Sequence, residues 1–215
     1  MAFHVLKIGG YDQYRYAWFE VSGEPNYGNA PHCPACHRPV GMLAWLPPHV
    51  VELKQAKHVG DFVLGAGGCP FLCQARVVER WRAHGLSGMD CLYPIQIAQN
   101  RTRQQTNDSV LYGIGVQHSV TRVEHDRMGV AWTWPPDANY CRTCGPGGGG
   151  VGGTIRSWER IVVDERSWRD EDLFFAVNFP GTMLVSERAA NVIRSEEWSN
   201  VTTILADEYG YAFHG

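Results

Sequence analysis

Hydrophobic, β-branched and aromatic residues fall into short runs along the chain, and most runs are bounded by glycine, proline or asparagine. Runs of this kind predict β-strands, here over residues 3–8, 14–21, 42–46, 92–98, 110–116, 128–134 and 160–163. Two other segments, 73–84 and 187–196, carry apolar residues at helical spacing, and Ser186 is a predicted N-cap for the second. The pattern as a whole predicts an α+β fold.

One pattern occurs twice. Residues 71–82 align with residues 183–194 at an offset of 112, with Arg76 over Arg188 and Arg82 over Arg194. Each copy predicts a short buried strand that turns into an amphipathic helix. We therefore expect a single domain, 1–215, made of two related strand-rich halves, about 1–100 and 101–215.

Four cysteines stand in two CxxC pairs, which we call knuckles. They are Cys33, Cys36, Cys141 and Cys144. Two knuckles are typical of a tetrahedral Zn²⁺ site in which four thiolates leave no open position for substrate. Because 104 residues lie between Cys36 and Cys141, the ion would join the two halves, and its binding would contribute to folding.

The other three cysteines are Cys69, Cys73 and Cys91. The repeat places Cys73 opposite Val185, at the end of a buried strand, so we interpret the three as core thiols. The alternative is a second metal site formed with His84. The three-residue gap between Cys69 and Cys73 makes that alternative less favoured.

Composition narrows the class of protein. The 215 residues include 19 basic and 22 acidic side chains and no basic block, which argues against nucleic-acid binding by charge alone. No leader-like start and no apolar run of membrane-spanning length is present, so we expect a cytoplasmic protein with no membrane contact. The glycine-rich stretch 146–153 lacks the lysine of a phosphate-binding loop and predicts a flexible loop.

Several of these features occur together in one known family. The knuckle pair, the Leu-Val-Ser-Glu-Arg stretch at 184–188, the preceding 170–175 and the weaker first copy at 80–88 resemble the double-CXXCG motif family over about residues 30–205. Its members are described as immunity proteins of bacterial swarming-inhibition toxin systems. The first knuckle departs from the pattern, because His37 stands where the family has glycine.

The resemblance implies a non-catalytic protein that binds and neutralises a cognate toxin. A tight interface needs aromatic or charged anchors. The candidate contact residues are Trp132, Trp134, Asp164, Glu165, Asp170, Glu171 and Asp172. The alternative is that the tryptophans lie on opposite faces of one strand, one of them in the core, and that the acids lie in a solvated loop or at a helix N-terminus.

Other functions remain open. Residues 33–37 have the sequence CxxCH, which is the attachment sequence of c-type haem, although haem attachment there would leave the second knuckle unexplained. A thiol oxidoreductase would use Cys33 and Cys36 at a helix start, where prolines crowd the sequence instead. Hydrolytic chemistry lacks a recognisable motif, and His118 and His125 read as surface residues. Zinc-ribbon binding of nucleic acid lacks a basic, aromatic face.

Overall fold

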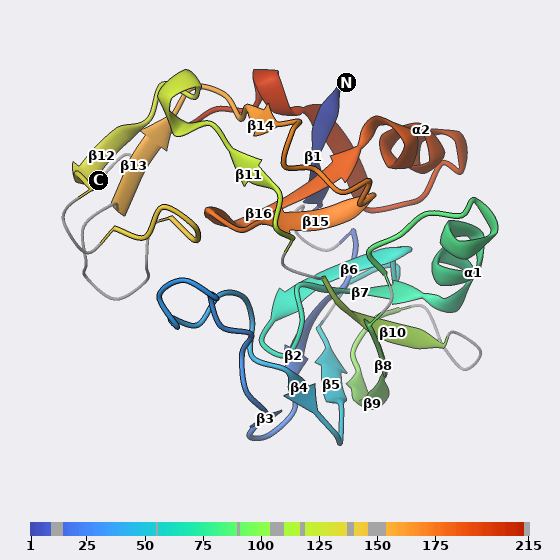
Figure 1. Ribbon diagram of the computed structural model, residues 1–215. Coiled ribbons are helices and arrows are strands. Elements are labelled where there is room, and N and C mark those ends of the chain that lie inside the picture. Colours follow the sequence, from blue (N-terminus) through green and yellow to red (C-terminus); the bar gives the residue numbers. More distant parts are fainter. Residues whose placement is uncertain are drawn as a thin grey trace.

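The computed structural model describes residues 1–9, 15–54, 56–89, 91–103, 110–116, 119–136, 140–145 and 154–212. Two β-sheets contain most of the strand residues of this part of the chain, one sheet above the other in Figure 1. The four-stranded sheet contains, in order, β15 (Leu173–Ala176), β16 (Phe179–Ser186), β1 (Phe3–Ile8) and β17 (Val201–Leu205). The seven-stranded sheet contains, in order, β8 (Cys91–Pro94), β10 (Leu111–Gly115), β7 (Phe71–Gln74), β6 (Phe62–Ala66), β2 (Trp18–Val21), β5 (Val50–Leu53) and β9 (Gln96–Asn100).

The four-stranded sheet has a counterpart within the larger one. The order β15–β16–β1–β17 corresponds to β6–β7–β10–β8, and every pairing in both runs is antiparallel. The registers correspond too. Equivalent neighbours across three strands are Phe174, Leu184 and Val5 in the smaller sheet and Val63, Leu72 and Gly113 in the larger.

Two strands lie in the sheet of the opposite part of the sequence. β1 comes from the N-terminal part but pairs with β16 and β17, whereas β10 pairs with β7 and β8. With a boundary near residue 100, each half gives one strand to the other half's sheet. Each sheet therefore contains strands from both halves. The relatedness of the halves in sequence stays a prediction.

The two predicted helices are confirmed. α1 (Ala75–Ala83) follows β7 directly and buries Val77, Val78 and Trp81. α2 (Glu187–Ser195) follows β16 directly and buries its own apolar stripe of Ala189, Ala190 and Ile193. The predicted cap also forms, because the Ser186 hydroxyl accepts a hydrogen bond of 3.1 Å from the Ala189 N–H.

A single hydrophobic cluster takes side chains from both sheets and both helices. Trp81 of α1 stacks on Trp198, which precedes β17, at a ring separation of 6.3 Å, and Phe62 of β6 packs against the same Trp198. Aromatic contacts of this kind add to the burial of apolar area in stabilising a core. The two sheets thus share one core.

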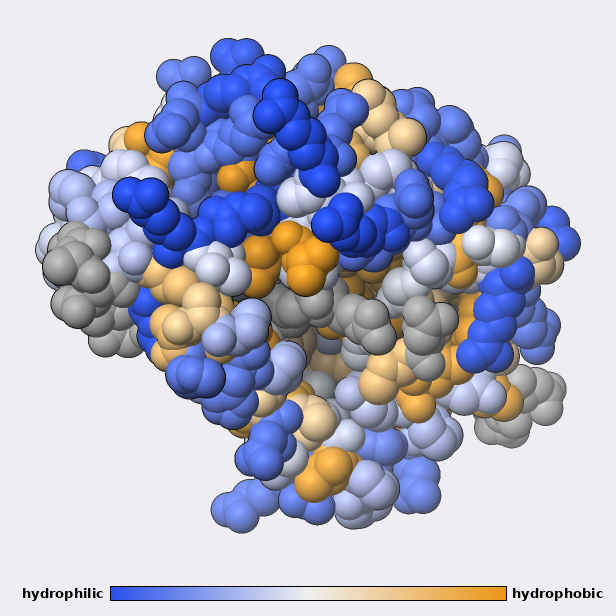
Figure 2. Space-filling model, viewed as in Figure 1, coloured by the Kyte–Doolittle hydropathy of each residue, from blue (hydrophilic) through white to orange (hydrophobic). Residues whose placement is uncertain are grey.

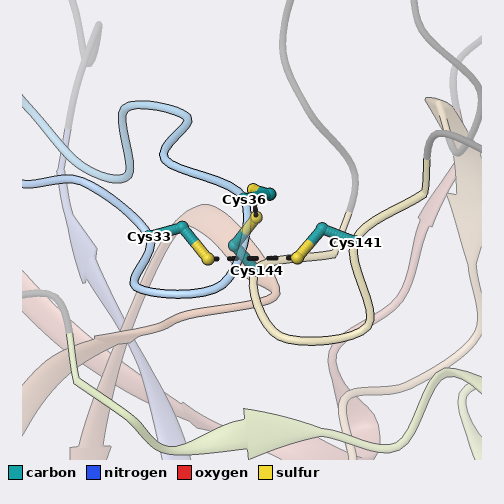
Figure 3. A group of neighbouring side chains, drawn as sticks. All are labelled: Cys33, Cys36, Cys141 and Cys144. Carbon is teal, nitrogen blue, oxygen red and sulfur yellow. Dashed lines mark hydrogen bonds between the residues drawn. The ribbon is translucent and has the colours of Figure 1, made fainter.

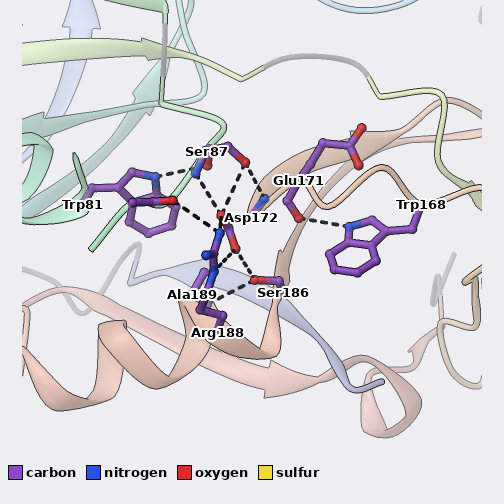
Figure 4. Close-up of polar contacts among 9 residues, drawn as sticks. Trp81, Ser87, Trp168, Glu171, Asp172, Ser186, Arg188 and Ala189 are labelled. Atoms are coloured by element: carbon purple, nitrogen blue, oxygen red, sulfur yellow. Dashed lines mark hydrogen bonds and ion pairs between the residues drawn. The ribbon is translucent and has the colours of Figure 1, made fainter. Parts of the chain in front are cut away.

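Asp172, just before β15, is a buried polar link between distant segments. Its carboxylate accepts hydrogen bonds from Ser186 Oγ at 2.6 Å, from Arg188 Nε at 3.1 Å and from the Ser87 N–H at 2.9 Å (Figure 4). Ser87 lies beyond α1, and its carbonyl oxygen accepts from Trp81 Nε1. The network therefore ties the end of α1 to the start of α2.

Asp61, just before β6, makes the corresponding link between the start of α1 and the segment that follows α2. It pairs with Arg76 Nη2 at 2.6 Å and accepts hydrogen bonds from the Ser199 N–H and Oγ at 2.9 and 2.8 Å. Ser199 lies beyond α2, 112 residues after Ser87. Each strand–helix unit therefore binds the serine that follows the helix of the other.

Three small sheets extend from the main layers. They pair β11 (Arg122–Val123) with β14 (Val163–Asp164), β3 (Asn26–Tyr27) with β4 (Trp45–Leu46), and β13 (Thr154–Trp158) with both β12 (Ala131–Trp134) and β18 (Tyr211–Ala212). Short 3₁₀ turns occupy His125–Arg127 and Ala206–Glu208.

Several predicted strands differ in extent from those observed. The strand at 3–8 is as predicted, but 42–46 is strand only at β4, 92–98 is split into β8 and β9 at Ile95, and β14 begins only at Val163. The strand predicted from residue 14 begins at Trp18, and 14 itself lies outside the described residues. The glycine stretch 146–153 also lies outside them.

The surface in Figure 2 is largely hydrophilic over the upper layer, and apolar residues gather along the middle, where the two layers meet. Within the described ranges, neither helix has the length and apolarity needed to cross a bilayer.

Candidate metal centre

Both knuckles fold into the same backbone turn. In the first, the His37 N–H donates to the Cys33 carbonyl at 2.9 Å, and in the second the Gly145 N–H donates to the Cys141 carbonyl at 2.7 Å. The residue after the second cysteine is left-handed in each, with φ of 57° at His37 and 70° at Gly145. His37 therefore adopts the conformation that glycine adopts freely, and the departure from the CXXCG pattern leaves the turn intact.

The turns bring the four sulfur atoms together. Cys33 Sγ lies 3.9 Å from Cys141 Sγ, and Cys36 Sγ lies 3.5 Å from Cys144 Sγ (Figure 3). All four sulfurs lie within 4.8 Å of one another. Four thiolates about 2.3 Å from a tetrahedral ion would be separated by about 3.8 Å. The four cysteines that the sequence singled out therefore form a group that can hold a metal ion.

Backbone N–H groups and burial set the protonation of these thiols. The pKa of Cys36 is lowered to about 6, chiefly by the Arg38 backbone N–H and also by the Arg38 side chain. The pKa of Cys141 is lowered chiefly by the Cys144 backbone N–H. Burial raises the pKa of Cys144. The knuckles thus favour thiolates at two positions, and a metal ion would favour the thiolate form of the buried thiol as well.

The second knuckle is fixed to β11 and to the turn between β15 and β16. Arg122 Nη1 donates to the Thr143 carbonyl at 3.0 Å. A Cβ at Gly145 would lie 2.8 Å from the carbonyl oxygen of Asn178, so the turn packs directly on that backbone. Asn178 in turn exchanges two hydrogen bonds with the Val123 backbone. These supporting residues carry no pattern in the sequence that identifies them.

The first knuckle is supported by its own flanking chain. The Cys33 N–H donates to the Arg38 carbonyl at 2.8 Å, and the Val40 N–H donates to the Pro31 carbonyl at 2.7 Å. These bonds form a narrow loop between β3 and β4. Arg38, immediately after the CxxCH sequence, is therefore part of the centre, and its position beside Cys36 is the signal that could have indicated it.

The arrangement limits the chemistry of the centre. A set of four thiolates completes a tetrahedral coordination sphere, so an ion held by all four has no position left for a water molecule or substrate. Cys33 is fully buried and faces Cys141, whereas attachment of haem requires both sulfurs of one knuckle to face a ring. The geometry therefore fits a metal ion with a structural role.

The remaining cysteines differ from one another. Cys69 and Cys73 are buried, as expected for core thiols, and burial raises the pKa of both, that of Cys69 to about 12. Cys91 is exposed on β8, so the prediction that it packs in the core is wrong. β8 is an edge strand of the larger sheet, which leaves one side of it open. His84 contacts Glu196, and the knuckles form the only metal-ligand group among the described residues.

The two predicted contact tryptophans lie on β12, and Trp132 packs beside the second knuckle. Trp132 is half-buried and makes edge-on ring contacts with His125 and with Tyr140, the residue before Cys141. Trp134 is 56% exposed. His125 is thus packed against aromatic rings, while His118 lies outside the described residues.

The predicted acidic residues occupy different environments. Asp172 is buried in the network described above, and half-buried Glu171 accepts hydrogen bonds from Ser119 and Thr121. Asp164 accepts a hydrogen bond from the Arg166 N–H, and Glu165 and Asp170 are exposed. The Glu165 carboxylate accepts a hydrogen bond of 2.8 Å from the amino group of Met1, so Asp170 is the more accessible of the two exposed acids.

Comparison with known proteins adds no family to this description. No protein-family model matches the chain, and no curated protein matches it in sequence.

Proposed function

We propose that the chain is a non-catalytic immunity protein, which binds and neutralises a cognate bacterial toxin and carries a structural Zn²⁺ in its four-cysteine centre. The observation that carries the proposal is the group of four sulfurs within 4.8 Å, contributed by two knuckles far apart in sequence. The toxin-binding role comes from the resemblance in sequence to the double-CXXCG family, which includes the same pair of knuckles.

Zinc is the metal that the donor set favours. Tetrahedral sites of four thiolates select zinc or iron, and closed four-cysteine sites of this spacing are typical of structural zinc. Because the unfolded chain has no preformed site, the binding energy of the ion contributes to folding. This centre joins the loop between β3 and β4 to the segment that follows β12.

We also propose that the two halves are related units that have exchanged their first strands. Support comes from the shared order and register of the two strand runs, from the two strand–helix units and from the reciprocal links of Asp61 and Asp172. In this arrangement the zinc and the exchanged strands hold the same two units together.

The test is capture from a native cell lysate on immobilised full-length protein, with zinc measured on the same preparation. We expect one protein partner at equal stoichiometry and one zinc per chain, and we expect co-expression to protect cells from that partner. Cys91→Ser, a control at an exposed cysteine outside the centre, should keep its zinc, whereas Cys144→Ser should lose it. No stoichiometric partner, or a captured partner against which co-expression gives no protection, would contradict the proposal.

A second candidate is thiol redox chemistry, which the 3.5 Å separation of the Cys36 and Cys144 sulfurs favours. A reversible disulfide would then form between knuckles instead of within one. Free-thiol titration of the purified protein distinguishes the two: bound zinc protects four thiols until a chelator is added, whereas a disulfide yields thiols only after reduction.

A further inference from the structure

Exposed apolar side chains are concentrated on the two segments that carry the knuckles. We call residues 26–46, which contain β3, the first knuckle and β4, the first arm. The second arm contains β12, the second knuckle, β13 and β18, that is residues 131–136, 140–145, 154–158 and 211–212. Of the nine large hydrophobic residues exposed in the described part of the chain, six lie on the arms: Tyr27, Met42, Leu43, Leu46, Trp134 and Tyr211. Such a concentration is typical of an interaction surface, whereas scattered apolar residues are not.

A hollow of about 370 Å³ lies beside the first arm. Met42 and Leu43 of the first arm line it together with Pro70, Tyr93 and Val116. No charged residue contributes to the lining. Its volume is near the lower end of the range for binding pockets, about 300–1,000 Å³, and therefore suits one large apolar side chain.

The charges on the arms have one sign. The two arms as defined contain no aspartate or glutamate, and their charged residues are Arg38, Arg142 and Arg156. Arg38 lies against Cys36, where it offsets the negative charge of the thiolates. Arg142 and Arg156 are exposed, and neither forms an ion pair within the described residues. These two guanidinium groups are available to carboxylates of a partner.

We infer that the two arms form a docking surface for an acidic region of a partner protein, which places an apolar side chain in the hollow. The knuckle loops lie between the β3–β4 and β12–β13 pairs (Figure 1), so the metal centre fixes the positions of the two arms. The inference rests on the proposed function and identifies its binding surface. A buried apolar anchor surrounded by charge-complementary contacts is the usual form of such an interface.

The probe is a phage-displayed library of random dodecapeptides, selected on the zinc-loaded full-length protein. Enriched peptides should combine aspartate or glutamate with an aromatic or leucine residue. Leu43→Asp and Arg142→Glu should each weaken their binding about tenfold or more. Val120→Asp is the matched control, because Val120 is 62% exposed, like Leu43 at 47%, but lies outside both arms. Its affinity for the peptides should equal that of the wild type.

Zinc content and melting temperature of each variant establish that the fold is intact. Selected peptides that bind both arm variants as tightly as the wild type, or a selection that enriches no acidic peptide, would overturn the inference. Binding of a single-stranded oligonucleotide that Arg142→Glu abolishes would also overturn it, in favour of nucleic acid.

The same variants separate this inference from the proposed function. If a captured toxin is neutralised equally well by Leu43→Asp and Arg142→Glu, the docking surface is wrong and the immunity function stands. If acidic peptides bind the arms but no toxin partner exists, the docking surface stands and the immunity function fails.

Discussion

His84 and Glu196 follow the last turns of α1 and α2 at positions 112 residues apart, and their side chains meet, with His84 Nε2 2.9 Å from Glu196 Oε1. Contact between equivalent positions is expected where an approximate twofold axis passes. The sulfur contacts of Cys33 with Cys141 and of Cys36 with Cys144 also join equivalent positions. Both ends of the molecule thus support the proposal of two related units.

The Glu196 contact predicts a dependence of stability on pH. The Arg80 guanidinium and then His84 lower the pKa of Glu196 from 4.5 to about 2. A carboxylate whose pKa is depressed by folding stabilises the folded state above its unfolded pKa, and this contribution is lost as the pH falls toward the folded pKa. Glu196→Gln should therefore be less stable than the wild type at pH 7, and the difference should disappear between about pH 4.5 and about pH 2.

Urea unfolding of both proteins across that pH range measures the effect. Loss of the proposed metal in acid would occur in both proteins and would cancel from the difference. Glu197→Gln, a change at the neighbouring acid, should show no such pH-dependent difference. A difference for Glu196→Gln that stays constant down to pH 2 would contradict the role assigned to its charge.

The two buried aspartates predict a matched pair of stability losses. Asp61→Ala and Asp172→Ala each leave an arginine and the donors of a serine without a buried acceptor, at a cost of about 3 kcal/mol. The cost lies mainly in the buried hydrogen bonds, because the side chains of Arg76 and Arg188 are more than half exposed. Chemical unfolding monitored by fluorescence gives both values.

If the Asp61 and Asp172 links are equivalent, the two substitutions should lower the free energy of unfolding by equal amounts. Asp207→Ala, at an exposed acid on the 3₁₀ turn after β17, should change the free energy of unfolding by less than about 0.5 kcal/mol. A large cost at Asp172 with none at Asp61 would show that the two links differ in their importance.

The sequence predicted the local elements and the metal centre better than the arrangement of strands. Both helices, the Ser186 cap and the four cysteines follow from short-range patterns. The position of β1 between β16 and β17 depends on pairing between residues about 180–200 positions apart, and no local pattern encodes that pairing. Likewise, nothing local to Asp172 distinguishes a buried ion pair from an exposed acid in a polar loop, since its partners Ser87 and Arg188 come from other segments.

The left-handed residues of the knuckles predict opposite outcomes for two substitutions. His37→Gly removes the conformational cost of a side chain at φ 57° and should stabilise the protein by up to about 1 kcal/mol, with zinc content unchanged. Gly145→Ala adds a Cβ at φ 70° that meets the Asn178 backbone, and should destabilise it by about 1–3 kcal/mol. Zinc titration and urea unfolding test both. A Gly145→Ala variant with the same free energy of unfolding as the wild type would show that the second turn tolerates a side chain.

Removal of one ligand predicts a loss of stability across the whole molecule. Cys36→Ser should abolish stoichiometric zinc and lower the melting temperature by on the order of 10 °C, because the proposed ion would join loops from both parts of the chain and several kcal/mol of its binding energy would depend on the folded site. Chelation of the wild type should produce the same shift, and the chelator should leave Cys36→Ser unchanged. Cys91→Ser controls for loss of a cysteine, since Cys91 is exposed and lies outside the centre. If Cys36→Ser melts at the wild-type temperature while binding no metal, the centre contributes nothing to folding, and a role in redox chemistry or in partner binding becomes the better explanation of the four thiols.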